Sequence, residues 1–336
     1  MPEECPTPQS DDDAASPFDA EQAATLITAI RHNIERALRG KPEVVRRAVE
    51  TLLAGGHLLL EDVPGVGKTT LAQALARSID GSFSRIQFTS DLLPSDVLGA
   101  SVPETRDGAP TGGFAFQPGP IFANVVLADE VNRASPKAQS ALLESMAESG
   151  VTIDGVTHAL PKPHFLVATQ NPLEHHGTHP LPESQLDRFL VRTRIGYPDP
   201  ADEAAVLRED PAATELPRLK PAVTIPELRR LQRAAQAVKF DEALVGYLLA
   251  IVAETRTHEA LEIGVSPRGA VSMRRAAQAR ALVDGRDFCI PEDVQDLAVD
   301  VFAHRITVDP RSRHSRDGEE TSWIVREILE ALPVPL

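Results

Sequence analysis

The spacing of apolar side chains divides the chain into a helical beginning, an alternating middle and a helical end. Apolar residues recur three or four apart over residues 18–38 and again over residues 42–56, so both stretches are predicted to form amphipathic helices. HLLLED, residues 57–62, is instead a short continuous apolar run, which is typical of a strand buried on both faces. Residues 69–79 then place apolar side chains four apart, which predicts a helix with one buried stripe.

Four further apolar runs predict strands, at residues 83–88, 124–130, 164–171 and 189–195. Helical or loop segments separate them, and this alternation favours an α/β fold in which helices sandwich a five-stranded parallel sheet. Residues 151–160 differ, because Asp154 and Gly155 lie between alternating β-forming residues. That pattern predicts a tight two-residue hairpin inserted between two strands of the sheet.

Beyond residue 200 only helical patterns remain, so the sequence predicts a domain boundary there. We expect an α/β core over residues 18–200 and a helical lid domain over residues 201–336. Residues 1–17 combine proline, serine and an acidic triplet with almost no apolar side chains, and are expected to form a disordered acidic tail.

The composition excludes several classes of protein. With 336 residues, 42% of them apolar, the chain can bury a core in each of two domains. It contains no apolar run long enough to span a membrane and shows no secretory pattern, so we expect a cytoplasmic protein. Its net charge of −15 disfavours nucleic acid as a partner. Cys5 and Cys289 lie far apart and indicate neither a disulfide framework nor a metal cluster.

The stretch EDVPGVGKTT, residues 61–70, is one departure from the phosphate-binding pattern GxxxxGK[ST], because Asp62 stands where the first glycine is expected. Glycines in the loop let successive backbone N–H groups face a phosphate, and the positive end of the helix dipole adds to the attraction. Lys68 is expected to reach the β and γ phosphates of ATP, and Thr69 to ligate Mg²⁺. The predicted nucleotide contacts in the loop are Pro64, Gly65, Val66, Gly67, Lys68, Thr69 and Thr70.

The alternative interpretation of this stretch is a glycine-containing turn before a helix. The apolar strand before the loop and the striped helix after it disfavour that alternative, because strand, loop and helix together are the context that phosphate binding requires.

Two later strands end in polar side chains that are expected to emerge beside this loop. Asp129 and Glu130 close the run VVLADE, where Asp129 suits the Mg²⁺ shell and Glu130 suits the polarisation of an attacking water. Asn171 follows VATQ and is expected to hydrogen-bond that water or the γ phosphate. Each signal is weak alone, since acidic residues often start loops and an asparagine before proline often forms a turn.

Two arginines complete the candidate chemistry. Arg188, in LPESQLDRF, begins the last strand on the far side of the core from its own phosphate loop, so it would act only on the nucleotide of a neighbour. Arg268, in GVSPRGA, lies one residue inside a helix that begins at Pro267 and is expected to point toward the phosphates. Without the other elements, either arginine would be interpreted as a surface charge or a structural ion pair.

These elements, in this order, resemble the AAA+ ATPases. The combination EDVPGVGKT, VLADEVNRA, ATQNP, LPESQLDRF and SPR resembles the MoxR family within them, over roughly residues 20–335. The resemblance implies that Asp62 is an accepted residue in the loop. It implies a ring, usually a hexamer, in which Arg188 is the finger of the adjacent site and Arg268 is the second sensor. It also implies a common partner class, proteins with a von Willebrand factor A domain.

The resemblance further assigns two insertions, one beginning at Gly99 and the other at the hairpin of residues 151–160, which in related rings face the central pore. Phe114 and Phe116 are the bulky aromatics of the first insertion, and the sequence leaves open whether they are exposed or pack locally.

His175, His176 and His179 lie within five residues, a spacing that suits a metal ion or a response to pH. No cysteine or convergent set of carboxylates accompanies them, so a solvated loop is the favoured interpretation.

The leading hypothesis from the sequence is an Mg²⁺-dependent ATPase that forms a chaperone-like ring and remodels or matures a partner protein. A DNA-translocating motor is an alternative, since related rings grip strands with the same hairpin. The acidic composition and the absence of lysine and arginine from residues 151–160 oppose it. A nucleotide-gated scaffold with little turnover is a second alternative. A small-molecule kinase is disfavoured, because such an enzyme needs neither Arg188 from a neighbour nor a large helical lid.

Overall fold

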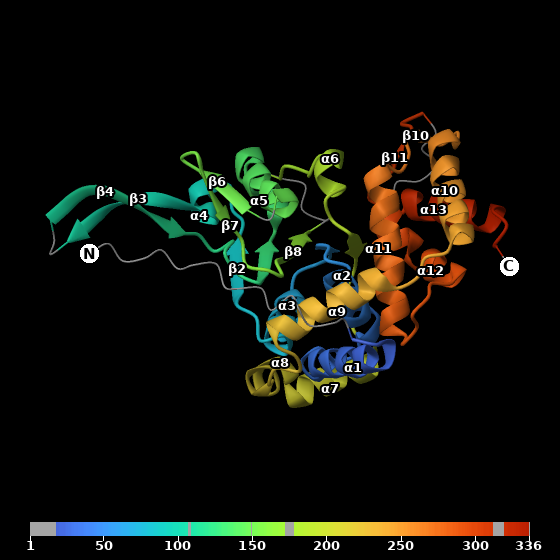
Figure 1. Ribbon diagram of the computed structural model, residues 1–336, viewed down its shortest axis with the longest axis horizontal. Coiled ribbons are helices and arrows are strands. Elements are labelled where there is room, and N and C mark those ends of the chain that lie inside the picture. Colours follow the sequence, from blue (N-terminus) through green and yellow to red (C-terminus); the bar gives the residue numbers. More distant parts are fainter. Residues whose placement is uncertain (1–17, 107–108, 149, 172–177, 312–318, 336) are drawn as a thin grey trace.

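The computed structural model describes residues 18–106, 109–148, 150–171, 178–311 and 319–335. It confirms the α/β fold, with a five-stranded parallel sheet in the order β2-β5-β8-β1-β9 between layers of helices (Figure 1). The strands of this sheet are β1 (Leu58–Glu61), β2 (Phe83–Gln87), β5 (Val125–Asp129), β8 (Phe165–Gln170) and β9 (Val191–Thr193). The predicted tail, residues 1–17, and both His175 and His176 lie outside the described residues.

Each face of the sheet is covered by its own helices. These helices are α1 (Ala20–Ala37), α2 (Pro42–Leu53), α3 (Lys68–Ser78), α4 (Pro94–Leu98) and α5 (Pro136–Glu148). Side chains alternate between the faces along a strand. Leu58 and Leu60 therefore join the core formed with α1, α2 and α3, whereas Leu59 joins a separate core formed with α4 and α5.

Two antiparallel hairpins lie beside the sheet. The first joins β3 (Gly99–Arg106) to β4 (Ala109–Pro118) and extends well away from the body of the molecule (Figure 1). The second joins β6 (Gly150–Ile153) to β7 (Val156–Ala159), and confirms the tight turn predicted at Asp154 and Gly155, whose φ angles are 50° and 80°.

The turn and the second strand of the short hairpin contact the long hairpin near its base. Ser101 Oγ donates to Asp154 Oδ2 at 2.6 Å, and the ring of Phe116 stacks on His158 with centroids 3.8 Å apart. Phe116 therefore packs locally, whereas Phe114 is 71% exposed on the long hairpin.

The chain beyond residue 200 is mostly helical, as predicted. Its elements are α7 (Pro200–Glu209), α8 (Pro211–Thr214), α9 (Ile225–Ala237), α10 (Glu242–Thr257), α11 (Pro267–Val283), α12 (Pro291–Phe302) and α13 (Glu320–Ala331), with a short sheet of β10 (Leu261–Ile263) and β11 (Thr307–Val308). Short helical turns precede them at α6 (Glu183–Leu186) and at Val131–Arg133, and a third lies at Leu216–Arg218. Within the described ranges, no helix is both long and apolar enough to cross a membrane.

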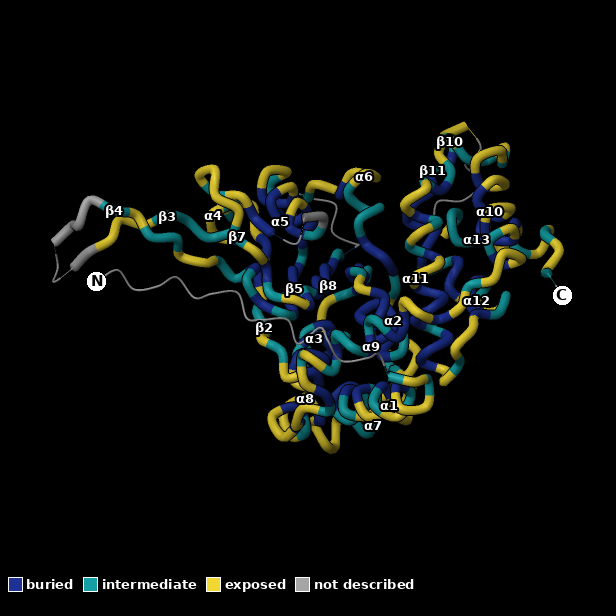
Figure 2. The backbone as a smooth tube through the Cα atoms, viewed as in Figure 1, coloured by how far each residue is buried: buried dark blue, intermediate teal, exposed yellow. Residues whose placement is uncertain are grey.

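Packing does not change abruptly at residue 200. Helices α7 and α8 lie beside α1 (Figure 1), and the backbone N–H groups of Ala222 and Val223 donate to Ser78 O at the end of α3. One buried cluster runs from α1, α2 and α3 through α9 into α11 and α12 (Figure 2). The boundary at residue 200 marks a change of secondary structure, and its status as a domain boundary stays a prediction.

A buried carboxylate, Glu50, joins α2 to the C-terminal helices. Glu50 is 1% exposed and accepts from Arg46 Nε and Arg47 Nη1, both at 2.8 Å, and Arg280 Nη1 of α11 lies 3.7 Å away. Arg47 Nε also donates to Asp300 of α12 at 2.7 Å. Because these charges compensate one another out of water, removing one leaves its partners buried and unpaired.

We predict that Glu50→Gln lowers the free energy of unfolding by about 3–5 kcal/mol, as expected when one partner of a buried ion pair is lost. Urea unfolding measures this difference. Glu35→Gln is the matched control, since Glu35 pairs with Arg31 at 3.7 Å on a solvent-accessible helix face and is expected to contribute less than about 1 kcal/mol. Similar losses of unfolding free energy in the two variants would contradict the conclusion that Glu50 connects α2 to the C-terminal helices.

Candidate active site

The loop between β1 and α3 has the conformation that phosphate binding needs. Gly65 and Gly67 have φ angles of 87° and 101°, in the left-handed region that favours glycine. A Cβ atom on Gly65 would meet nothing within 4 Å, so the space on that side of the loop is open to a ligand. A Cβ atom on Gly67 would lie 2.6 Å from Leu38 Cδ1, the end of a flexible side chain just after α1, so the positive φ is the stronger reason for glycine at this position.

The loop forms one wall of a cleft of about 340 Å³ at the carboxyl edge of the sheet. The cleft is lined by Pro64, Gly65, Gly67, Lys68, Thr69, Thr70, Arg85, Gln87, Asp129 and Glu130. Lys68 is buried, and its Nζ donates to Asp62 O at 2.9 Å. The structure thus brings together most of the predicted loop residues and both predicted carboxylates. Asn171 follows β8, is buried and is not among the residues that line the cleft.

Thr169, a fully buried residue of β8, holds the end of β5 from which the two carboxylates emerge. Thr169 Oγ1 donates to Asp129 Oδ1 at 2.6 Å and accepts from Glu130 N–H at 2.9 Å. Arg85 of β2 donates to Asp129 Oδ2 at 2.6 Å, and Gln87 Nε2 donates to Glu130 Oε2 at 2.8 Å. All three partners lie near the carboxyl ends of neighbouring strands, and this shared position is the signal in the sequence that could have identified them.

The residues present fit Mg²⁺ and a nucleotide phosphate chain. The hydroxyl of Thr69 and the carboxylate of Asp129 face one cleft, and oxygen donors of these kinds are the ligands that Mg²⁺ prefers. The loop amides and Lys68 supply the donors and the positive charge that phosphate oxygens require.

A second cavity lies on the opposite side of the loop and is more apolar. It is lined by Gly65, Val66, Gly67 and Thr70 from the loop, by residues 37–39 and Lys41 after α1, and by Tyr197, Pro198, Glu203, Val206, Leu207 and residues 210–212. Sequence reasoning missed this cavity, apart from the loop residues, because its walls are far apart along the chain. Its position and apolar walls suit the nucleoside part of a ligand whose phosphates occupy the cleft.

The two predicted arginines lie away from the cleft. Among the described residues, neither Arg188 nor Arg268 lines it. Arg188 Nη1 donates to the carbonyl oxygen of Leu143 in α5. Arg268 is exposed in the first turn of α11, and its role as a second sensor that points toward the phosphates stays a prediction.

Asp187 links the segments that carry these arginines. Its carboxylate accepts from Ser266 Oγ, the N-cap of α11, at 3.2 Å and from Arg305 Nε at 2.9 Å. Burial lowers the pKa of Arg305 to about 10, Arg268 adds to the shift, and Asp187 opposes it. Since Arg188 follows Asp187 and Arg268 follows Ser266 by two residues, both arginines lie at the junction of the core with α11.

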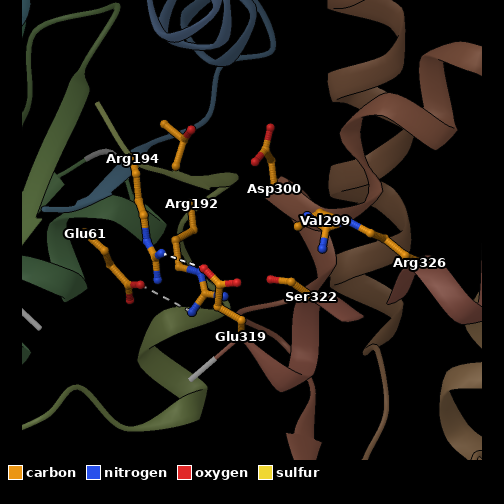
Figure 3. Close-up of a pocket in the computed structure, with 9 residues that line it drawn as sticks. Glu61, Arg192, Arg194, Val299, Asp300, Glu319, Ser322 and Arg326 are labelled. Carbon is orange, nitrogen blue, oxygen red and sulfur yellow. Dashed lines mark hydrogen bonds and ion pairs between the residues drawn. The ribbon is translucent and has the colours of Figure 1, made fainter. Parts of the chain in front are cut away.

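A third cavity separates the edge of the sheet from α12 and α13 (Figure 3). Its walls carry charges of both signs, and two ion pairs are formed there: Glu61 with Arg192 at 3.6 Å and Arg194 with Glu319 at 3.2 Å.

Of the three histidines in the predicted loop, one lies within the described residues. His179 is described, and its backbone N–H donates to Asn132 O at 2.7 Å. In the parts of the chain that the structure describes, no three His, Cys, Asp or Glu side chains form a group that could hold a metal ion.

Known proteins share this fold and this loop. The family described as "ATPase family associated with various cellular activities (AAA)" matches residues 57–191, and the AAA lid domain matches residues 253–328. A crystal structure of a candidate ATPase from Cytophaga hutchinsonii superposes with a TM-score of 0.85 and 33% identity, over 94% of this chain and 97% of that one. The fold and the cleft therefore define an AAA+ ATPase.

Relatives narrow the assignment. The chain is 48% identical to the uncharacterized protein YeaC of Bacillus subtilis, over 92% of this chain and 94% of that protein. It is 39% identical to Chaperone MoxR1 of Mycobacterium tuberculosis, over 94% of this chain and 84% of that protein. It is 30% identical to Protein MoxR of Methylorubrum extorquens, over 90% of this chain and 93% of that protein. The chain belongs to the MoxR family of AAA+ ATPases.

We predict that Thr169→Val lowers ATP turnover and raises the Mg²⁺ concentration needed for half-maximal turnover, by about 10- to 100-fold, because the hydroxyl that holds the Asp129 carboxylate and the backbone of Glu130 is lost. Steady-state ATP hydrolysis across a Mg²⁺ series measures both effects. Thr169→Ser keeps the hydroxyl and is expected to stay within about threefold of the unaltered protein. Equal effects of the two substitutions would show that the methyl group, and not the hydroxyl, is what matters.

Proposed function

We propose that the protein is an Mg²⁺-dependent ATPase that works as a ring, with each catalytic site completed by a neighbouring subunit. The observation that carries this proposal is that the predicted catalytic residues of one chain lie in two separate places. The loop, Lys68 and the two carboxylates share one cleft, whereas Arg188 and Arg268 do not line it and lie within two residues of the contact between Asp187 and Ser266.

Within the cleft each side chain has a distinct task. Lys68 and the loop amides bind the β and γ phosphates, and in doing so Lys68 exchanges Asp62 O for a phosphate oxygen. Thr69 and Asp129 would hold Mg²⁺, which neutralises charge on those phosphates. Glu130 polarises the attacking water, and Gln87 and Thr169 hold Glu130 in place. Asn171 is proposed to orient the same water.

Among the described residues, the cations that line the cleft are Lys68, which is assigned to the phosphates, and Arg85, which is paired with Asp129 at 2.6 Å. We infer that a further cation stabilises the charge that develops on the γ phosphate in the transition state. An arginine supplied by another molecule is worth about 10³ to 10⁵ in rate in comparable enzymes. Arg188 is the proposed finger, and Arg268 is proposed to contact the same nucleotide. In such an assembly, the face of one subunit that carries the arginines contacts the face of the next that carries the cleft, and repetition of this contact closes a ring. The expected ring is a hexamer.

We predict that Arg188→Ala lowers ATP turnover by about 10³-fold or more, and that Lys68→Ala abolishes turnover by loss of phosphate binding. Mixing the two variants in equal amounts should restore activity, because Lys68→Ala subunits donate Arg188 to the intact loops of Arg188→Ala subunits. Random assembly gives about one quarter competent sites.

Turnover of the mixture is measured against each variant alone at the same total concentration. A mixture no more active than the sum of its parts would contradict a shared site. Full activity of Arg188→Ala subunits on their own would contradict the role of Arg188.

We further propose that the ring uses ATP to remodel a client protein, as the name of its relative Chaperone MoxR1 suggests for that protein. A protein with a von Willebrand factor A domain is the proposed partner class. The long β3-β4 hairpin, with Phe114 exposed, is the proposed client contact. The short hairpin of residues 151–160 contains no lysine or arginine, so it offers no charge for gripping DNA.

We predict that Glu130→Gln subunits bind ATP without hydrolysing it and therefore retain their client. Affinity capture of this variant from cell extract with ATP, compared with Lys68→Ala, should enrich a specific protein. Capture of nucleic acid alone, with ATP turnover that rises with DNA and falls steeply with salt, would favour the DNA motor instead. Normal cellular function of Glu130→Gln would favour a scaffold with little turnover.

A further inference from the structure

The residue that breaks the strict loop pattern, Asp62, has a defined set of partners. Asp62 is 7% exposed, and its Oδ2 accepts from the backbone N–H groups of Ile195 at 2.6 Å and Gly196 at 2.7 Å. Its Oδ1 accepts from Val63 N–H at 2.9 Å. One buried carboxylate therefore connects the start of the phosphate loop to the segment that leaves β9, more than a hundred residues later in the chain.

The segment that Asp62 holds leads directly into the apolar cavity behind the loop. Tyr197 and Pro198, which follow Gly196, line that cavity opposite Gly65, Val66 and Gly67. Lys41 Nζ donates to Tyr197 O at 2.6 Å, so the far end of the same segment is attached to the wall after α1. The relative position of the phosphate loop and this wall thus depends on the Asp62 carboxylate.

Glycine at position 62 would have no atoms to accept these N–H groups. Buried backbone donors without a partner are unfavourable, and hydrogen bonds to a charged acceptor are among the stronger ones in proteins. The carboxylate is not there to bind phosphate, because a negative charge close to the loop opposes the binding of an anion. Its benefit must lie in the geometry that it imposes on the two segments.

We propose that Asp62 is a positioning residue that sets the cavity for the nucleoside part of ATP relative to the phosphate loop. The inference rests on the proposed function, since it takes ATP as the ligand of both compartments. It has an unusual consequence: Asp62→Gly, which restores the strict GxxxxGK[ST] pattern, weakens the binding of ATP.

The test compares two ligands on the full-length protein by calorimetry with Mg²⁺ present. ATP occupies both compartments, whereas sodium tripolyphosphate occupies only the phosphate loop. For Asp62→Gly we expect the affinity for ATP to fall about tenfold or more, which corresponds to about 1.4 kcal/mol. The affinity for tripolyphosphate should stay within about threefold or rise, because a repulsive charge is removed.

Asp241→Ala is the matched control. Asp241 accepts from Ala243 N–H at the start of α10 and has no connection to the loop. This variant loses a carboxylate that caps a helix, so it reports the general effect of losing such a hydrogen bond. We expect its affinities for both ligands to match those of the unaltered protein.

Asp62→Asn provides a second variant that keeps the shape of the side chain. Its amide oxygen can still accept from Ile195 and Gly196, so we expect a smaller loss of ATP affinity, about two- to threefold. Amide hydrogen exchange of the peptide that contains residues 195 and 196 gives a readout without ligand. Exchange should be slowest in the unaltered protein, faster in Asp62→Asn and fastest in Asp62→Gly.

Parallel losses for ATP and tripolyphosphate in Asp62→Gly, or no loss for either, would overturn the proposal. So would unchanged exchange at residues 195 and 196. An unaltered protein that binds no ATP would instead refute the proposed function, and the two failures are therefore distinguishable.

Discussion

The site depends on one constraint: β1 lies between β8 and β9 in a parallel sheet, so all their carboxyl ends emerge at the same edge. The register places Glu61 beside Gln170 and Gln87 beside Asp129. These pairings align the ends of the strands. The strand ends alone therefore bring together the phosphate loop, the two carboxylates and Thr169. A shift of one residue in β1 would displace the loop along this edge and would exchange the two buried cores that Leu58, Leu59 and Leu60 join.

Much of this arrangement could be predicted from the sequence, because its signals are local. Apolar runs predicted the strands, and the glycines with Lys68 predicted the phosphate loop. Asp129 and Glu130 were predicted as site residues because they lie at the end of a strand. The Asp154 and Gly155 turn was likewise predictable, since two residues between β-forming runs suffice to define it.

The parts that sequence reasoning missed are contacts between distant segments. The partners of Asp62 are backbone amides near residue 195, and a backbone amide leaves no mark in a sequence. Arg85, Gln87 and Thr169 are polar residues in or at the end of strands, and only the register shows that they meet the carboxylates. The placement of Arg268 depends on how α11 docks on the core, which local pattern does not specify.

Asp187 gives the helical end of the chain a direct connection to the proposed catalytic arginine. Arg305 lies just after α12, is almost fully buried and donates a hydrogen bond to the Asp187 carboxylate. Ser266, at the start of α11, donates a second hydrogen bond to the same carboxylate. A rotation of these helices relative to the sheet would therefore move Arg188 as well. In the proposed ring, such a connection would couple the nucleotide state of one subunit to the catalytic site of the next.

The long β3-β4 hairpin differs in this respect, because its strands pair with each other and contact the rest of the protein mainly near their base. Substitutions along its outer part would leave the buried cores and the nucleotide compartments unchanged. The sequence of this arm can therefore vary while the fold of the ATPase core is retained, so the proposed client contact is free to change independently of the nucleotide site.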